Sequence, residues 1–214
     1  MGILTRPLQA GRPAGPAQPA TATWRDGLPS FVEPGFALRE IEMDDAASLL
    51  AHVATDDVSR FISPPPATVA GFERFIHWSR QHRQAGHSAC FAIVPDGATR
   101  AVGLFQLRSL EAGFVRAEWG FAMGSAYWGT GIFPAAASHV LEFAFTAVGV
   151  ARLEARAVVM NGRGNGALRK VGAVQEGLLR RSFLRHGEYH DQVLWSMLAD
   201  EWHRKRSLHR TRIH

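Results

Sequence analysis

A chain of 214 residues with 46% hydrophobic and 20% charged residues can form one α/β domain with a well-buried core, and this composition is typical of a soluble globular protein. No apolar run approaches the ~20 residues that span a membrane, no signal-peptide segment opens the chain, and the single cysteine, Cys90, excludes an internal disulfide, so we expect a cytoplasmic protein. The net charge of +5 equals the five lysines and arginines after residue 203, so the rest of the chain is neutral and is not a basic platform for nucleic acid.

The two ends of the chain differ in composition from its middle. Residues 1–34 are rich in proline, glycine and alanine and have no apolar period. We therefore expect a disordered or loosely packed extension, from which Trp24 and Phe31 can contact the body. Residues 201–214 form a basic tail that we expect to be a solvated extension. Between them, residues 35–200 are expected to form the single domain.

Within this domain the spacing of apolar residues separates strands, with a period of two, from helices, with neighbours three and four apart. In chain order we expect a strand at 36–41, helices at 44–54 and 68–84, strands at 90–94, 102–108 and 114–123, a helix at 133–148, a strand at 152–159, a loop at 161–166, a short helix at 167–171, and strands at 175–184 and 189–197. This order predicts an α/β fold with one mixed, mostly antiparallel, twisted sheet of about six or seven strands and about four helices. The strands at 114–123 and 152–159 should be parallel, because a helical crossover joins them.

The segment YWGTGIF at 127–133 lies between an expected strand and an expected helix. Gly129 and Gly131 let the backbone turn sharply and present its N–H groups without side-chain obstruction. The first turn of the following helix accepts Pro134, because no N–H is needed there, and adds a positive dipole end. Backbone N–H groups and a helix N-terminus together favour an anionic group, most often a phosphate.

Two common phosphate-binding loops fit this segment poorly. A Walker loop requires Lys-Ser or Lys-Thr after its second glycine, and neither follows. A dinucleotide-binding fingerprint requires a third glycine where this chain has Pro134, and the strands before the loop indicate an antiparallel meander rather than a βαβ unit. A strand–helix turn that binds nothing stays open on these residues alone.

Three segments of the chain resemble a known protein family and occur in the same order as in that family. AEWGFAMGSAYWGTGIFPAAASHVLEFAF, RLEARAVVMNGRGNGALRKVGAVQEGLLRR and GEYHDQVLWSML resemble the GCN5-related N-acetyltransferases (GNAT). They are most similar to the branch that acetylates protein N-termini, the ribosomal-protein-alanine N-acetyltransferases of the RimJ and RimL type. The resemblance covers about residues 36–198. The family's loop motif, [QR]-x-x-G-x-[GA], falls on 126–131, where its glycines match and its leading Gln or Arg is replaced by Ala126.

The resemblance implies an enzyme that uses acetyl-CoA and no metal, and that transfers acetyl to a primary amine by direct attack in a ternary complex. The amine would belong to a protein N-terminus or a small molecule; no membrane partner is implied, nucleic acid is an unlikely partner, and monomer and homodimer both stay open. The N–H groups of the loop would bind the CoA pyrophosphate, and strand residues would pair with the pantetheine arm. Two further residues, Asn161 and Lys170, match family motifs that come after the loop in the sequence. The expected cofactor-binding residues are Phe121, Ala122, Met123, Trp128, Gly129, Thr130, Gly131, Ile132, Phe133, Asn161 and Lys170. For Asn161, a turn-forming role before Gly162 is the alternative.

Acetyl transfer to an amine requires a group that accepts the proton of the amine. Glu118 is the expected catalytic residue, because it lies mid-strand among apolar neighbours, where an unpaired carboxylate is costly. A structural ion pair with Arg116 or Arg156 is the alternative for Glu118. Glu154 is a second candidate base, with arginines as its neighbours on the same face of its strand.

The proton donor and the acceptor pocket are less defined. The Ser and Tyr that are frequent in the family are replaced by Gly164 and Leu168, so we assign no donor. The resemblance places the acceptor pocket between 61–65 and 185–189, and the prolines there favour an apolar or peptide-like acceptor. Two other functions stay open: an acyl-CoA-binding module with little catalysis, and a protein that associates with nucleic acid or ribosomes through its basic tail.

Overall fold

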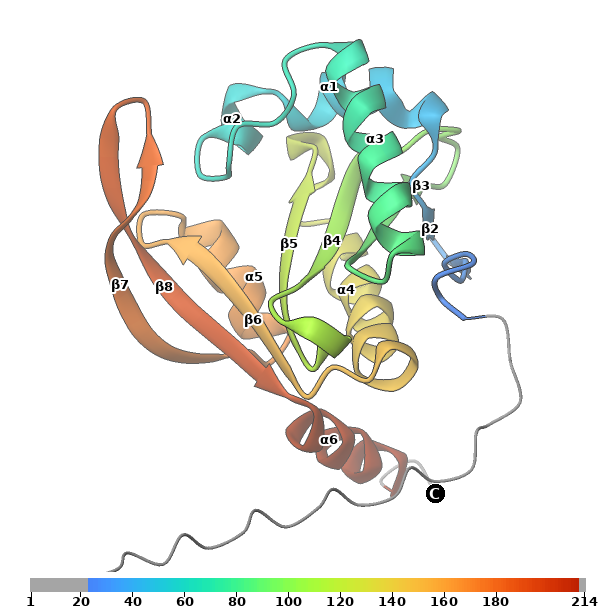
Figure 1. Ribbon diagram of the computed structural model, residues 1–214, viewed down its shortest axis with the longest axis vertical. Coiled ribbons are helices and arrows are strands. Elements are labelled where there is room, and N and C mark those ends of the chain that lie inside the picture. Colours follow the sequence, from blue (N-terminus) through green and yellow to red (C-terminus); the bar gives the residue numbers. More distant parts are fainter. Residues whose placement is uncertain (1–22, 212–214) are drawn as a thin grey trace, which may run out of the picture.

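The computed structural model describes residues 23–211 of the chain. These residues form one eight-stranded sheet with the strand order β1-β2-β3-β4-β5-β6-β8-β7 (Figure 1). The strands are β1 (Phe31–Glu33), β2 (Phe36–Glu40), β3 (Ser88–Pro95), β4 (Gly103–Ser109), β5 (Arg116–Met123), β6 (Arg152–Val158), β7 (Val174–Arg185) and β8 (Glu188–Leu198). Every neighbouring pair is antiparallel except β5 and β6, which are parallel as expected.

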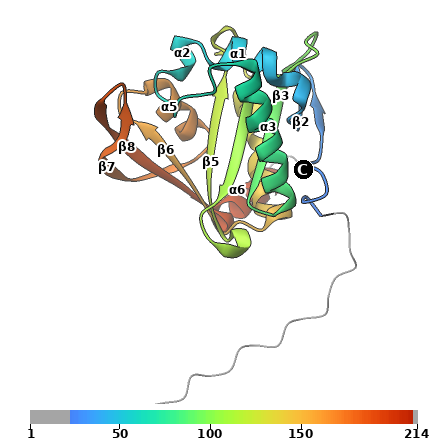
Figure 2. The same ribbon diagram turned by 45° about the horizontal axis from the view of Figure 1, so that its top comes forward.

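Helices cover both faces of this sheet (Figures 1 and 2). Within the described residues the α-helices are α1 (Ala46–Val53), α2 (Asp56–Ser59), α3 (Val69–Gln84), α4 (Ile132–Glu142), α5 (Gly162–Lys170) and α6 (Ala199–Thr211). The segment η4 (Phe143–Val148) continues α4 as a π-helix, and η1 (Met43–Asp45), η2 (Ala112–Phe114) and η3 (Ser125–Tyr127) are short 3-10 turns.

Two hydrophobic clusters hold these layers together. One lies between the sheet and α4, and the other lies between the opposite face and helices α1 and α3. Cys90 belongs to the second cluster, and burial raises the pKa of its thiol to about 12, so it is a packing residue. The two-sided covering explains why the residues of β3 are buried on both faces.

Local signals in the sequence set the ends of the helices. The Thr68 hydroxyl accepts a hydrogen bond from the Gly71 N–H and caps α3 after the proline-rich loop. Gly149 ends η4 with φ +82°, a left-handed conformation that glycine adopts without strain. These positions are close to the helix ends that the sequence predicts.

The structure corrects the expected counts of elements. The sheet has eight strands rather than six or seven, because the short β1 pairs with β2 at the edge. The helices within the described residues number six rather than about four, because α2 and α6 are additional. The expected loop at 161–166 and the short helix after it form the single helix α5, because the Asn161 side chain caps the helix earlier than the glycine-rich sequence suggests.

Ordered structure also extends past both expected limits of the domain, 35 and 200. Strand β1 and Trp24, whose ring packs edge-on against Phe114 at 5.4 Å, belong to the segment expected to be disordered or loosely packed. Helix α6 includes part of the expected solvated tail, and Trp202 packs against Phe145 at 5.8 Å. Residues 1–22 and 212–214 of the expected extensions lie outside the described residues.

Candidate active site

The parallel strands β5 and β6 pair over only three residues and then separate. Their register ends at the pair Glu118–Glu154, while β6 continues to pair with β8 as far as Val158. Residues 119–123 of β5 therefore pair with β4 on one side and present an unpaired backbone edge on the other. This open edge has N–H and C=O groups that an extended ligand can bind as a strand would.

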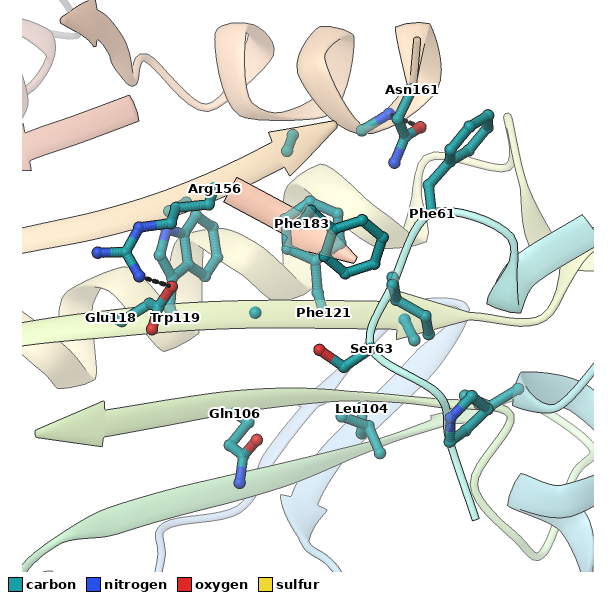
Figure 3. A pocket seen from close by; sticks show the side chains of 18 of the residues that line it. Phe61, Ser63, Leu104, Gln106, Glu118, Trp119, Phe121, Arg156, Asn161 and Phe183 are labelled. Carbon is teal, nitrogen blue, oxygen red and sulfur yellow. Dashed lines mark hydrogen bonds and ion pairs between the residues drawn. The ribbon is translucent and has the colours of Figure 1, made fainter. Parts of the chain in front are cut away.

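A cavity of about 680 Å³ lies beside the opening between the two strands. Glu118 and Arg156 lie at one end of the view in Figure 3, and Asn161 lies at the other. The cavity touches β4, β5 and β6 along its floor and the α2–α3 segment and β7 along its walls. Of the expected site residues, it brings together Glu118, Phe121, Ala122 and Asn161.

The walls of this cavity are mainly apolar. Phe61, Phe72 and Phe75 line it together with the three consecutive prolines 64–66, and Phe183 of β7 faces them (Figure 3). Residues 61–65 thus line the cavity as expected, but 185–189 do not; Ser182 and Phe183 take their place. The reason is that β7 extends to Arg185, so the hairpin turn lies beyond the cavity.

Two arginines hold the carboxylate of Glu118. The Arg108 Nη2 atom lies 2.5 Å from Glu118 Oε2, and the Arg156 Nη1 atom lies 3.3 Å from Oε1. Glu118 is therefore an ion-paired carboxylate, in agreement with the alternative stated for this residue. Of the two arginines considered as partners, Arg156 is one, and the other partner is Arg108 rather than Arg116. The side chain of Glu118 is 19% exposed, so the pair is accessible from the cavity.

Glu154, the second candidate base, has a structural environment. Its side chain is 6% exposed and accepts hydrogen bonds from Arg152 Nε at 2.9 Å and from Arg116 Nη2 at 3.2 Å. Burial raises the pKa of Glu154, but the two guanidinium groups outweigh burial and hold the pKa below its ordinary value. Such a carboxylate is ionised and shielded, which suits it to an ion-pair network better than to proton transfer.

The glycine loop has the backbone geometry of an anion site. Gly129 has φ +81° and Gly131 has φ +89°, and a side chain at either position would point into open space. Within residues 23–211, the N–H groups of 129–133 have no hydrogen-bond acceptor. They stand at the start of α4, where the unpaired amides of a first helical turn favour a negative charge. The loop therefore has the geometry of an anion site that a phosphate group would fit.

Trp128 fixes this loop in place. Its Nε1 donates to the carbonyl oxygen of Met123 at 2.8 Å, which joins the loop to the end of the open β5 edge. The Arg163 guanidinium lies 4.2 Å from the centre of the Trp128 ring. The sequence reasoning missed Arg163, although an arginine two residues after the motif asparagine could have indicated it. Arg108 was missed too, because it lies on a different strand from Glu118.

Asn161 caps helix α5 and lines the cavity at the same time. Its Oδ1 atom accepts from the Gly164 N–H at 2.8 Å, so the turn-forming alternative describes part of its role. A β-carbon at Gly164 would lie 2.5 Å from Asn161 Nδ2, so a serine there would require Asn161 to move. Lys170 is exposed at the other end of α5 and does not line the cavity.

The family comparison agrees with this geometry. The family model described as "Acetyltransferase (GNAT) domain" matches residues 36–174. The chain therefore belongs to the GNAT family and is an N-acetyltransferase, an enzyme class that uses acetyl-CoA.

Individual relatives are distant but cover most of the chain. The chain is 25% identical over 166 residues to the "Uncharacterized N-acetyltransferase p20" of Bacillus licheniformis, which covers 77% of this chain and 93% of the relative. The Mycobacterium smegmatis RimJ in complex with CoA-disulfide has a TM-score of 0.70 and 26% identity, covering 78% of this chain and 83% of that one. A ribosomal-protein-S5-alanine acetyltransferase from Vibrio fischeri shares the fold with a TM-score of 0.73 and 20% identity. The match covers 81% of this chain and 98% of that one.

Two further properties concern the described residues. No helix among them has the length and apolar character needed to cross a membrane. Within the same part of the chain, no group of three or more His, Cys, Asp or Glu side chains is arranged to hold a metal ion.

Proposed function

We propose that this enzyme transfers the acetyl group of acetyl-CoA to a primary amine by direct attack in a ternary complex. The observation that carries the proposal is the continuity of three features. The glycine loop joins the open edge of β5 through the Trp128–Met123 hydrogen bond, and this edge borders a cavity with Glu118 on its floor. A phosphate site, an extended slot and a carboxylate thus follow one another along β5.

The loop and the β5 edge are the parts that would hold acetyl-CoA. The N–H groups of 129–133 would bind the pyrophosphate, and the backbone of 121–123 would pair with the pantetheine arm. Asn161 faces the same cavity and would contact the arm or the acceptor. When bound, acetyl-CoA supplies an acetyl thioester. Lys170 is left out of this proposal because it lies away from the cavity.

Glu118 would accept the proton that the acceptor's ammonium group must lose, directly or through water. Arg108 holds one carboxylate oxygen at 2.5 Å and so fixes the orientation of the other. Among the described residues that line the cavity, Glu118 is the one acid. The hydroxyls of Ser63 and Ser182 also line it, but no observation selects either as a proton donor.

The walls favour an acceptor with an apolar group next to its amine. Five phenylalanines and three prolines line the cavity together with Glu118, which suits the first residues of a polypeptide better than a polyamine with several charges. The Vibrio fischeri protein is named for acetylating a ribosomal-protein alanine, which supports a peptide N-terminus as the acceptor class.

Acetyl-CoA binding tests the cofactor part of this proposal. We expect acetyl-CoA, but not NAD, to raise the melting temperature of the wild-type protein. Gly131→Asp should abolish this response, because its carboxylate would repel the phosphates. Gly97→Asp is the matched control: Gly97 also has positive φ and open space around it, but it lies in the β3–β4 turn. A wild-type protein that does not respond to acetyl-CoA would disprove the proposal.

The role of Glu118 and the acceptor class need a turnover assay. We expect a screen of N-terminal peptides, aminoglycosides and polyamines, read out as released thiol, to favour peptides that begin with a small or apolar residue. Glu118→Gln should reduce kcat by about 10²–10⁴-fold while acetyl-CoA affinity stays unchanged. Unchanged turnover would remove Glu118 from this role, and binding without turnover of any amine would favour the acyl-CoA-binding module.

A further inference from the structure

The two oxygens of Glu118 are held with unequal strength. Arg108 lies 2.5 Å from Oε2, whereas Arg156 lies 3.3 Å from Oε1. Hydrogen bonds between a guanidinium and a carboxylate are usually about 2.7–2.9 Å long, so the contact to Oε1 is long and weak. Oε1 is therefore the oxygen that can exchange its partner at low cost.

Arg156 has a second carboxylate within reach. Its Nη2 atom lies 3.8 Å from Glu154 Oε2, on the strand that separates from β5 at this point. Glu154 already accepts hydrogen bonds from Arg116 and Arg152, so its charge is compensated without Arg156. Arg156 can thus leave Glu118 and stay paired with Glu154, whereas Arg108 forms its ion pair with Glu118 among the described residues.

An acceptor amine brings a cation into the same place. A primary amine is mostly protonated at neutral pH, because its pKa lies near 8 for a chain terminus and above 10 for a lysine-like group. Among the described residues that line the cavity, Glu118 is the one acid and Arg108 and Arg156 are the basic residues. An ammonium that binds Oε1 beside Arg156 would meet a like charge, so one of the two cations has to move.

We propose that Arg156 occupies the position of the acceptor's ammonium on Glu118 Oε1 and moves to Glu154 when the acceptor binds. In the free enzyme Arg156 keeps the carboxylate compensated inside an apolar cavity, and Arg108 keeps it oriented throughout. Arg156 is thus a positioning residue that competes with the acceptor. This inference rests on the proposed function, because it takes Glu118 as the group that receives the amine.

Other charges around Glu118 agree with this exchange. Arg108 comes from β4, Arg156 and Glu154 from β6, and Arg116 from β5 itself, where its guanidinium pairs with Glu154 and Glu111. The facing α2–α3 segment contributes phenylalanines, prolines and Ser63 to the cavity. Among the described residues that line the cavity, those of the α2–α3 segment and β7 carry no charge, so none of them would replace Arg156 when it moves.

Kinetics of three variants test the proposal, with a peptide acceptor from the screen described above. Arg156→Gln should lower the acceptor KM about threefold to tenfold, because the competitor is gone, and should reduce kcat less than Arg108→Gln does. Arg156→Lys retains the cation and should keep a KM near that of the wild type. Arg100→Gln is the control: Arg100 pairs with Asp44 at 2.8 Å and belongs to neither the Glu118 nor the Glu154 ion pairs. A raised KM in Arg156→Gln, or the same kinetics in Arg156→Gln and Arg100→Gln, would overturn the inference.

A binding measurement tests the same exchange without turnover. Methylammonium chloride is titrated into protein carrying carbon-13 in its glutamate carboxyl groups, and the Glu118 signal is assigned from Glu118→Gln. We expect half-saturation at about threefold to tenfold lower methylammonium in Arg156→Gln than in wild type, with Arg100→Gln unchanged and tetramethylammonium without effect. Equal titrations in Arg156→Gln and wild type contradict the proposal. If the wild-type protein did not bind acetyl-CoA, the proposed function would be contradicted. The methylammonium titration uses no acetyl-CoA, so it would still test the exchange at Glu118.

Discussion

Arg163 contacts the glycine loop from the neighbouring helix α5. Helix α5 places it after Asn161, and its guanidinium stacks on Trp128 of the glycine loop. A guanidinium on an aromatic ring keeps its N–H donors available at the ring edge. Arg163 thus adds a full positive charge against Trp128 of the glycine loop, whose own residues 127–133 carry none.

We therefore expect Arg163→Ala to weaken acetyl-CoA binding roughly tenfold, because a charge-assisted hydrogen bond to phosphate contributes about 1.5 kcal/mol or more. Titration calorimetry at two salt concentrations measures this, and the salt dependence should decrease with the lost charge. Arg169→Ala is the control, because Arg169 lies over Trp195 on another side of the same helix. Equal losses in both variants would indicate a general effect of charge on α5.

At the scale of elements, an ion-pair network ties the outer strands to the body. Arg152 of β6 donates to both oxygens of Glu176 on β7, at 2.8 and 2.5 Å, and Ser196 of β8 donates to the same carboxylate at 2.6 Å. These hydrogen bonds lower the pKa of Glu176 to about 2. Strands β6, β7 and β8, which all contribute residues to the cavity, are thus linked through one carboxylate.

This network predicts a loss of stability in acid. Because the folded-state pKa of Glu176 lies below the unfolded value of about 4.3, the contribution is complete above that value and disappears as pH falls toward 2. Glu154, whose pKa is also lowered, acts in the same direction. Urea unfolding between pH 7 and pH 3 should show a smaller pH dependence for Glu176→Gln than for wild type. Glu188→Gln, at the turn of the same hairpin, is the control; an unchanged dependence in Glu176→Gln would refute the assignment.

At the scale of the whole molecule, the two ends of the described chain pack on the same side of the sheet. The rings of Trp24 and Phe143 of η4 pack edge to face with their centres 6.3 Å apart, and Trp202 of α6 packs against Phe145 of η4. Trp202 Nε1 and Arg206 Nη1 both donate to Glu142 at the end of α4. Helix α6 lies at the opposite end of the sheet from α1 and α2 (Figure 1), so its contacts stabilise the fold without reaching the cavity.

We expect Trp202→Ala to lower the free energy of unfolding by about 2–3 kcal/mol, because the large ring is lost but is only partly buried. Acetyl-CoA affinity should stay within about twofold of wild type under folding conditions. Chemical denaturation and calorimetry measure the two quantities, with the half-exposed Trp78→Ala as a control. A selective loss of acetyl-CoA affinity would show that α6 reaches the site.

Much of this architecture could be predicted from the chain because its signals are local. Thr68, Gly149 and the alternation within β5 set helix ends and a strand by contacts with near neighbours in sequence. The glycines 129 and 131 could be assigned because their positive φ is a property of the backbone itself. The additional helices α2 and α6 were not predicted, since one is a single turn and the other is stabilised by contacts with η4.

The sequence by itself determined the fold class, the parallel crossover, the glycine loop before α4 and the choice of Glu118 as a candidate base. Only the tertiary structure decided how that base is held: Arg108 is ten residues away and Arg156 thirty-eight, on two other strands. It also decided that Glu154 is a structural carboxylate and that Phe183 rather than the hairpin turn faces the acceptor space. Strand register and side-chain charge pairing across strands set these features, and neither is encoded by residues that are close together in the sequence.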